Sequence, residues 1–120
     1  MPQTIMIVAN DPNIIYLLQR YAEESGFQTV KTSQDTDVLT LAQQVKPALI
    51  IVDINLPGTM GGEVLRCLKA DPCTSNIPVV VYSYLDEPLD DWGEGVAGYL
   101  GKSVMYDDFV TVLERAGAHL

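Results

Sequence analysis

Residues 48–53 are Ala48-Leu49-Ile50-Ile51-Val52-Asp53, an unbroken apolar run that ends at a carboxylate. Such a run is typical of a strand buried on both faces, because a strand with one face in water would alternate apolar and polar residues. Strands of this kind occur mainly in parallel sheets that helices cover on both sides. The stretch therefore predicts a central parallel strand with Asp53 at its carboxyl end.

On both sides of this stretch, strand-like runs alternate with segments of helical periodicity. Asp11 and Pro12 have the residue types of a helix cap and a first helical position, and Gly26 is placed to close that helix. We expect the other strands at residues 5–8, 27–32, 78–83 and 96–100, and the helices at residues 12–25, 35–46, 63–70 and around 109–116. We expect a loop at residues 56–62, and at most a short helix at residues 85–95, which contain Pro88.

This alternation predicts an α/β fold, with parallel strands joined by crossover helices that lie on both faces of the sheet. The sequence has no linker or repeat, so residues 1–120 are expected to form a single domain. In such folds ligands bind beyond the carboxyl ends of the strands. The residues expected at those ends are Asn10, Asp11, Asp53, Ser83 and Lys102.

The composition argues against several classes of protein. The formal net charge is −9, from 7 basic and 16 acidic residues, whereas nucleic-acid-binding domains normally carry a basic patch. No apolar run approaches the roughly 18–20 residues that span a bilayer, and the first residues lack the features of a signal peptide. Cys67 and Cys73 are expected to be reduced thiols rather than a disulfide or a zinc site. We therefore expect a cytoplasmic protein that binds neither nucleic acid nor membrane.

Four segments, in this order along the chain, resemble the receiver domain of bacterial response regulators, the phosphoacceptor half of two-component systems. They are Ile7-Val8 followed by Asp11-Pro12, then Leu49-Ile50-Ile51-Val52-Asp53-Ile54-Asn55-Leu56-Pro57-Gly58, then Ile77-Pro78-Val79-Val80, and then Gly98-Tyr99-Leu100-Gly101-Lys102. The resemblance covers nearly the whole chain. It implies a doubly wound, flavodoxin-like fold whose five parallel strands have the order 2-1-3-4-5, and a signalling module rather than an enzyme.

The resemblance also implies a role for each matching residue. Asp53 falls on the phosphorylated aspartate, and Ser83 and Lys102 fall on the hydroxyl residue and the lysine that contact the phosphoryl group. Tyr99 falls on the aromatic residue that changes rotamer on activation. Asn55 falls on the position whose backbone carbonyl helps to hold Mg²⁺. These roles agree with chemistry, since a carboxylate can attack a phosphoryl donor and cationic groups can neutralise the charge that is transferred.

The chain departs from the family where the metal is held. The family places two adjacent acids after the first strand, whereas this chain has Ala9 and Asn10 at those positions. Ala9 has no ligand atom, Asn10 offers only a neutral oxygen, and Asp11 is expected chiefly to cap a helix. We therefore expect Mg²⁺ binding to be weak or absent, with Asn10, Asp11, Asp53 and Asn55 as the candidate ligands.

Two functions remain open. In the first, Asp53 accepts a phosphoryl group from a histidine kinase or phosphotransfer protein. In the second, the chain is a pseudo-receiver that binds partners without being phosphorylated, because Ala9-Asn10 replace the acidic pair. Both predict a downstream protein partner, bound by the last helix and by the face that runs from Leu85 to Tyr106. A nucleotide- or flavin-binding enzyme on the same architecture is disfavoured, because no loop suited to cradling phosphate is present.

Overall fold

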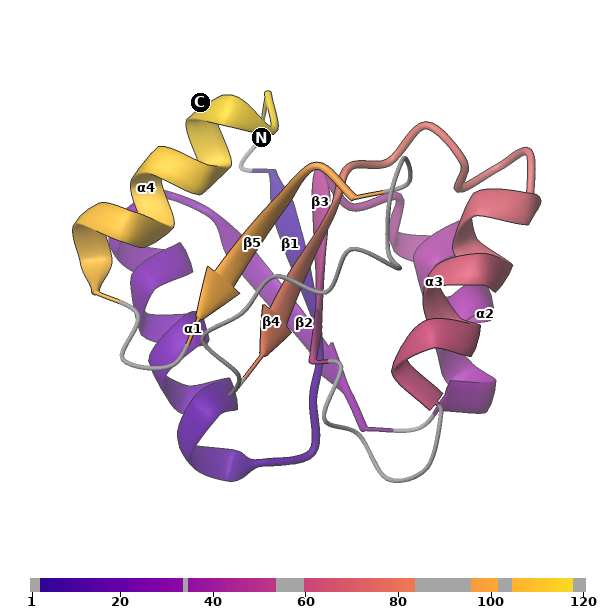
Figure 1. Cartoon of the computed structure of the whole chain (residues 1–120), viewed down its shortest axis with the longest axis horizontal. Helices are drawn as coiled ribbons and strands as arrows, with labels where there is room; N and C mark the ends of the chain where they lie inside the picture. Colours follow the sequence, from indigo (N-terminus) through magenta and orange to yellow (C-terminus); the bar gives the residue numbers. More distant parts are fainter. Residues whose placement is uncertain (1–2, 34, 54–59, 84–95, 102–104, 118–120) are drawn as a thin grey trace.

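The computed structural model describes residues 3–33, 35–53, 60–83, 96–101 and 105–117. Its centre is a sheet of β1 (Thr4–Val8), β2 (Gln28–Thr32), β3 (Leu49–Asp53), β4 (Val79–Ser83) and β5 (Gly98–Gly101). The strand order is β2-β1-β3-β4-β5, and all neighbouring strands are parallel. Both the parallel sheet and the 2-1-3-4-5 order are confirmed. The arrowheads of β4 and β5 in Figure 1 point toward the carboxyl edge of this sheet.

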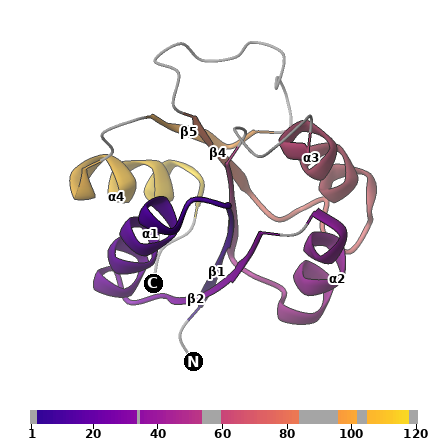
Figure 2. The ribbon, with the colours of Figure 1, turned by 90° about the horizontal axis from the view of Figure 1, so that it is seen from below.

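Helices cover the two faces of the sheet in pairs, as Figures 1 and 2 show. α1 (Pro12–Glu24) and α4 (Tyr106–Arg115) lie on one face, and α2 (Asp35–Val45) and α3 (Met60–Ala70) lie on the other. This is the doubly wound arrangement that the alternating sequence pattern predicts. It follows that side chains of the central strands are buried whichever face they point to.

Each face of the sheet has its own hydrophobic core. Alternate residues of the strands, such as Ile5, Ile7, Leu49 and Ile51, join the core under α1 and α4. Their neighbours, such as Met6 and Val8 of β1 and Ile50 and Val52 of β3, join the core under α2 and α3. All five residues of β3 are buried, which explains why this strand has no polar residue before its last position.

α1 begins and ends as its sequence predicts. The Asp11 side chain accepts a hydrogen bond from the Asn13 backbone N–H at 2.8 Å, and Pro12 is the first helical residue. Gly26 follows the helix with a φ of 92°, a left-handed conformation that suits glycine after a helix end. The cap sets the path by which the chain leaves the carboxyl end of β1.

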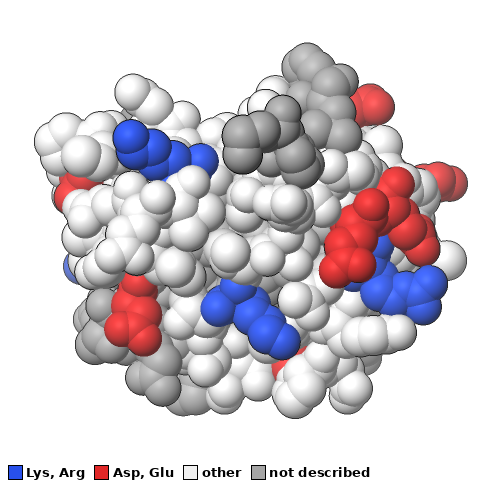
Figure 3. All heavy atoms as spheres, turned by 180° about the vertical axis from the view of Figure 1, so that it is seen from behind, with Lys and Arg blue, Asp and Glu red and all other residues white. Residues whose placement is uncertain are grey.

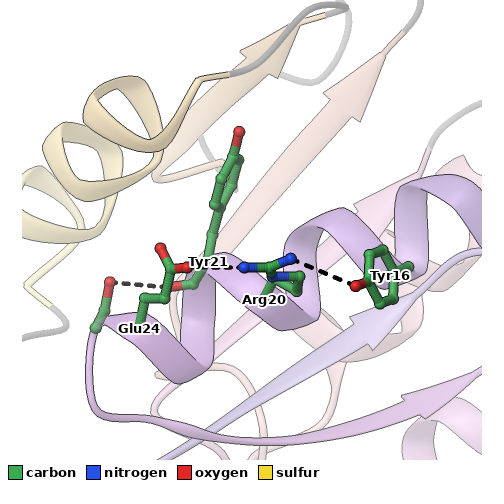
Figure 4. Close-up of polar contacts among 5 residues, drawn as sticks. Tyr16, Arg20, Tyr21 and Glu24 are labelled. Carbon is green, nitrogen blue, oxygen red and sulfur yellow. Dashed lines mark hydrogen bonds and ion pairs between the residues drawn. The ribbon is translucent and has the colours of Figure 1, made fainter.

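The solvent face of α1 carries a row of polar contacts (Figure 4). Arg20 donates a hydrogen bond to the Tyr16 hydroxyl and forms an ion pair with Glu24, both at 3.4 Å. Tyr21 points the other way, and its ring meets Tyr106 and Phe109 of α4 at centroid distances of 5.7 Å. Because aromatic contacts of this kind add to the burial of apolar area, α1 and α4 pack as a unit on their face of the sheet.

Several expected boundaries are wrong by a few residues. The loop expected at residues 56–62 is too long, because α3 already begins at Met60 and includes Gly61 and Gly62. Glycine is costly inside a helix, but in the first turn the backbone N–H groups have no intrahelical partner and the turn tolerates it better. β5 begins at Gly98 rather than at Val96. The expectations for residues 85–95 lie outside the described residues.

Two further features concern the surface and the thiols. Among the described residues, no helix is long and apolar enough to cross a membrane. Cys67 and Cys73 are both exposed free thiols, as expected. Figure 3 shows the back of the molecule, where basic and acidic side chains are interspersed with uncharged ones.

Candidate functional site

Asp53 is the last residue of β3 and lies at the carboxyl edge of the sheet. Its register partner on β4 is Tyr82, and the residue is only 4% exposed. By strand alternation, its side chain lies on the same face as Leu49 and Ile51, the face that α1 and α4 cover. Asp53 is therefore buried, although it lies at the edge of the sheet, and its strand is flanked by β1 and β4.

The chain at the end of β1 borders this carboxylate. The Ala9 backbone N–H donates to the Thr32 carbonyl at 3.1 Å, so the β1–β2 ladder continues one residue beyond Val8. Since Val8 pairs with Val52, Ala9 lies at the level of Asp53 in the register. Ala9 is 1% exposed and offers no side-chain ligand, whereas Asn10 is exposed.

Asp11 has the helix-capping role that the sequence predicts. Its carboxylate holds the Asn13 N–H, and its backbone carbonyl accepts from Ile15 at 3.0 Å. A carboxylate committed to a helix N-terminus is stabilised there, because the first N–H groups of a helix are partial positive charges. Asp11 consequently reaches the site from the start of α1 rather than from the sheet.

The remaining candidates fall partly within the described structure. Ser83 is the last residue of β4, next to the Asp53 partner Tyr82, and it pairs in register with Gly101 at the end of β5. Lys102 follows Gly101 and lies outside the described residues, as does Asn55. Tyr99 lies in β5, pairs with Val81, and is 41% exposed. The strand ends that carry Asp53 and Ser83 thus meet at one edge of the sheet.

Tyr82 borders the site and was not anticipated from the sequence. It is 1% exposed and belongs to the core under α1 and α4. Burial raises the pKa of its phenol, and the carboxylates of Asp53 and Asp11 raise that pKa further. The hydroxyl therefore stays protonated at neutral pH and lies within the field of both acids. The feature of the sequence that could have indicated this position is a tyrosine that follows three valines near the end of a strand, Val79-Val80-Val81-Tyr82.

The described residues do not form a carboxylate-rich cradle for Mg²⁺. Mg²⁺ favours carboxylate oxygens in a near-ideal octahedral shell. Ala9 supplies no oxygen, Asn10 supplies a neutral one, and Asp11 is occupied at the helix cap. Among the residues that the structure describes, no group of three or more potential acidic, thiol or imidazole ligands comes together. The acid pair expected of a strong magnesium site is not provided by the end of β1.

Comparison with known proteins identifies the family. The model of the response regulator receiver domain matches residues 5–114. The chain belongs to this family. Receiver domains are signalling modules of two-component systems; in general they interact with histidine kinases and downstream partners, and they typically bind Mg²⁺.

Full-length relatives support the assignment. The receiver domain is 36% identical over 119 residues to protein PilH of Pseudomonas aeruginosa, a match that covers 97% of this chain and 96% of that protein. It is 31% identical to the polar-differentiation response regulator DivK of Brucella anthropi, with 95% of each chain covered. The similarity therefore extends over essentially the whole of these relatives.

Solved structures show the same fold. The chemotaxis response regulator CheY4 of Vibrio cholerae superposes with a TM-score of 0.86 at 18% identity, covering 97% of this chain and 99% of that one. The receiver domain of the sensor histidine kinase PA1611 of Pseudomonas aeruginosa gives 0.85 at 16% identity, covering 98% and 99%, and has a magnesium ion coordinated in its active site cleft. The phosphorylated cyanobacterial phytochrome response regulator RcpA gives 0.75 at 28% identity, covering 93% and 89%.

Proposed function

We propose that this receiver domain accepts a phosphoryl group on Asp53 from a histidine kinase or phosphotransfer protein, in the cytoplasm. The observation that carries the proposal is the position of Asp53, a carboxylate held at the carboxyl end of the central strand β3 beside the end of β4. In open α/β sheets, sites form at such strand ends. The phosphorylated relative RcpA is 28% identical and supports the same assignment.

The chemistry follows from the roles proposed for three residues. An Asp53 carboxylate oxygen attacks phosphorus, the P–N bond of the phosphohistidine breaks, and the histidine of the donor leaves with the electron pair and takes up a proton. The product is an acyl phosphate. The Ser83 hydroxyl and the Lys102 ammonium group are assigned to the phosphoryl oxygens, where a donor and a positive charge offset the negative charge that arrives.

Mg²⁺ is assigned a weak or absent role in this chain. Asn10, Asp11, Asp53 and Asn55 are the candidate ligands, and only two of them are carboxylates. When bound, the ion would screen charge between Asp53 and the incoming phosphoryl group. With Asp11 engaged at the start of α1, we expect a dissociation constant in the millimolar range or weaker, on the order of 10⁻³ M.

The output surface is assigned to the residues between Leu85 and Tyr106 together with α4. In this proposal Tyr99 is the switch residue, since it is 41% exposed on the edge strand β5, next to β4 and Ser83. A phosphoryl group that attracts the Ser83 hydroxyl would open space for the Tyr99 ring, and a downstream protein would bind one of the two arrangements.

The alternative is a pseudo-receiver that binds partners without phosphorylation. The burial of Ala9 at the level of Asp53 favours it, because this position cannot be converted into a metal ligand by a side-chain rearrangement. The two functions share the fold and the output surface. They differ in one property, which is whether Asp53 becomes phosphorylated.

The deciding experiment is intact-mass measurement after incubation with a small phosphodonor, with and without Mg²⁺. The proposal expects one phosphoryl adduct on the wild-type chain, none on Asp53→Asn, and a modest dependence on Mg²⁺. Transfer from a phosphorylated phosphotransfer domain is the second arm. A wild-type chain that gains no adduct from either donor would establish the pseudo-receiver function instead.

A further inference from the structure

Three side chains form one row across the carboxyl edge of the sheet. Asp53 lies in the middle on β3, with its register partner Tyr82 on β4 at one side. Ala9, one residue past the Val8–Val52 pair, lies at its level on the β1 side. Ala9 and Tyr82 both belong to the core between the sheet and α1 and α4, so all three side chains are on the same face.

The sizes of the two flanking residues are complementary. Ala9 is the smallest side chain that can occupy a core position of this row, and Tyr82 is the largest side chain of the fully buried set. Both are 1% exposed, so neither side chain is open to solvent. Because protein interiors are packed to uniform density, a small residue at one place in a layer requires a large one nearby.

The strand order places Tyr82 directly beside the acceptor candidate. Tyr82 and Asp53 are register partners on the neighbouring strands β4 and β3, and Asp53 lies between Tyr82 and the end of β1. Because neighbouring strands are only about 5 Å apart and both residues are on the same face, the buried Tyr82 side chain packs next to Asp53.

We propose that Tyr82 is a positioning residue of the acceptor site, whose phenol occupies the space beside Asp53 that a metal-binding carboxylate at position 9 would require. Ala9 and Tyr82 are then a matched pair, and the lack of an acid at position 9 is compensated sterically by the tyrosine on β4. The proposal deepens the site assigned to Asp53. In this proposal two residues make the site a poor fit for Mg²⁺: Ala9 supplies no ligand, and Tyr82 fills the space that a ligand at position 9 would need.

The test introduces an acid at position 9 in two backgrounds and measures Mg²⁺ binding with the metal alone, from amide chemical shifts. With Tyr82 present, Ala9→Asp should leave the Mg²⁺ dissociation constant within about threefold of the starting value. In the Tyr82→Val background the same substitution should tighten binding by on the order of tenfold, because the carboxylate then has room to reach the ion.

Asn10→Asp is the matched control, because Asn10 is exposed and lies outside the packed row. It should tighten Mg²⁺ binding by the same factor in both backgrounds. If Ala9→Asp changes the Mg²⁺ affinity by the same factor with and without Tyr82, the matched pair does not exist and the proposal is overturned.

A second arm needs no metal and covers the case in which Ala9→Asp unfolds the wild-type chain. Ala9→Val should lower the melting temperature by several degrees when Tyr82 is present, and by clearly less in the Tyr82→Val background. Equal losses in both backgrounds would overturn the proposal. Neither experiment measures phosphorylation. Both therefore test the Ala9–Tyr82 pair even if Asp53 is found not to be phosphorylated.

Discussion

Asp53 and Asp11 are both carboxylates at the carboxyl edge of the sheet, but their different surroundings suit them to different roles. Asp11 holds the first turn of α1 through the Asn13 N–H, and this bond fixes its carboxylate at the helix end. Asp53 ends a fully buried strand and lies beside a protonated phenol. We therefore propose Asp53 as the nucleophile, whereas Asp11 caps α1.

Asp53→Asn should preserve the fold. Asparagine is nearly isosteric with aspartate, so it fits the same space at a position only 4% exposed. We expect the free energy of unfolding to change by less than about 2 kcal/mol, measured by urea denaturation. Loss of the cooperative transition would show that the Asp53 carboxylate is a structural requirement of the β3 end.

The raised pKa of Tyr82 gives stability a dependence on alkaline pH. Below its usual pKa of 10.0 the phenol is protonated in both folded and unfolded chains. Between pH 10.0 and the higher pKa of the folded state, only the unfolded chain releases the proton, so stability is lost as the pH rises through this window. Tyr82→Phe lacks this loss. Urea denaturation of both proteins from pH 9 to 11 should therefore show curves that diverge, whereas parallel curves would contradict the shift.

At Gly98, the strand β5 packs closely against the helix α4. A Cβ atom built at Gly98 would lie 2.9 Å from Cγ1 of Val112, a side chain of α4. Real Cβ atoms do not approach carbon this closely, so any larger residue requires the Val112 side chain, or the helix that carries it, to shift. The glycine is needed here for close approach rather than for an unusual backbone angle.

Gly98→Ala should therefore destabilise the domain by about 1–3 kcal/mol, through overpacking between β5 and α4. Gly101→Ala is the matched control on the same strand, because a Cβ there meets nothing within 4 Å. Its free energy of unfolding should stay within about 0.5 kcal/mol of the wild type. Adding Val112→Ala to Gly98→Ala should recover part of the loss. Equal effects of the two glycine substitutions would refute the close-contact explanation.

The elements differ in how well the sequence predicts them. β3 and α1 are predicted nearly to the residue, because an unbroken apolar run and an Asp-Pro cap each have few alternative structures. The start of α3 was missed, since Gly61 and Gly62 favour a loop locally and only their place in the first turn makes them acceptable. The Asp53–Tyr82 pair was missed for another reason: strand register depends on contacts between distant segments, which no local pattern encodes.

In the molecule as a whole, the sheet separates two cores, and the acceptor candidate belongs to only one of them. Asp53 shares its face with α1 and α4, whose contact is reinforced by Tyr21, Tyr106 and Phe109. A change at Asp53 therefore reaches α4 through a well-packed layer. Such a layer does not deform continuously, so α4 moves only if the layer has a second stable arrangement.

We accordingly expect a limited response to a phosphate mimic. With saturating beryllofluoride, amide shifts should change near Asp53, Ser83 and Tyr99, while those of Phe109 and Leu113 in α4 stay within the range of exposed control amides such as that of Tyr16. Heteronuclear NMR on the labelled domain measures this directly. A concerted change along α4 would instead establish a two-state switch that includes the helix.

β2 is an edge strand of the sheet, and this position affects how the protein behaves at high concentration. Within the part of the chain that the structure describes, β2 is hydrogen-bonded on one side only, to β1, so a strand of another molecule could pair with its other side. The exposed Lys31 near its carboxyl end places a positive charge on this edge strand. Pairing two such edges side by side would bring like charges together, so we expect this lysine to disfavour edge-to-edge association at high concentration.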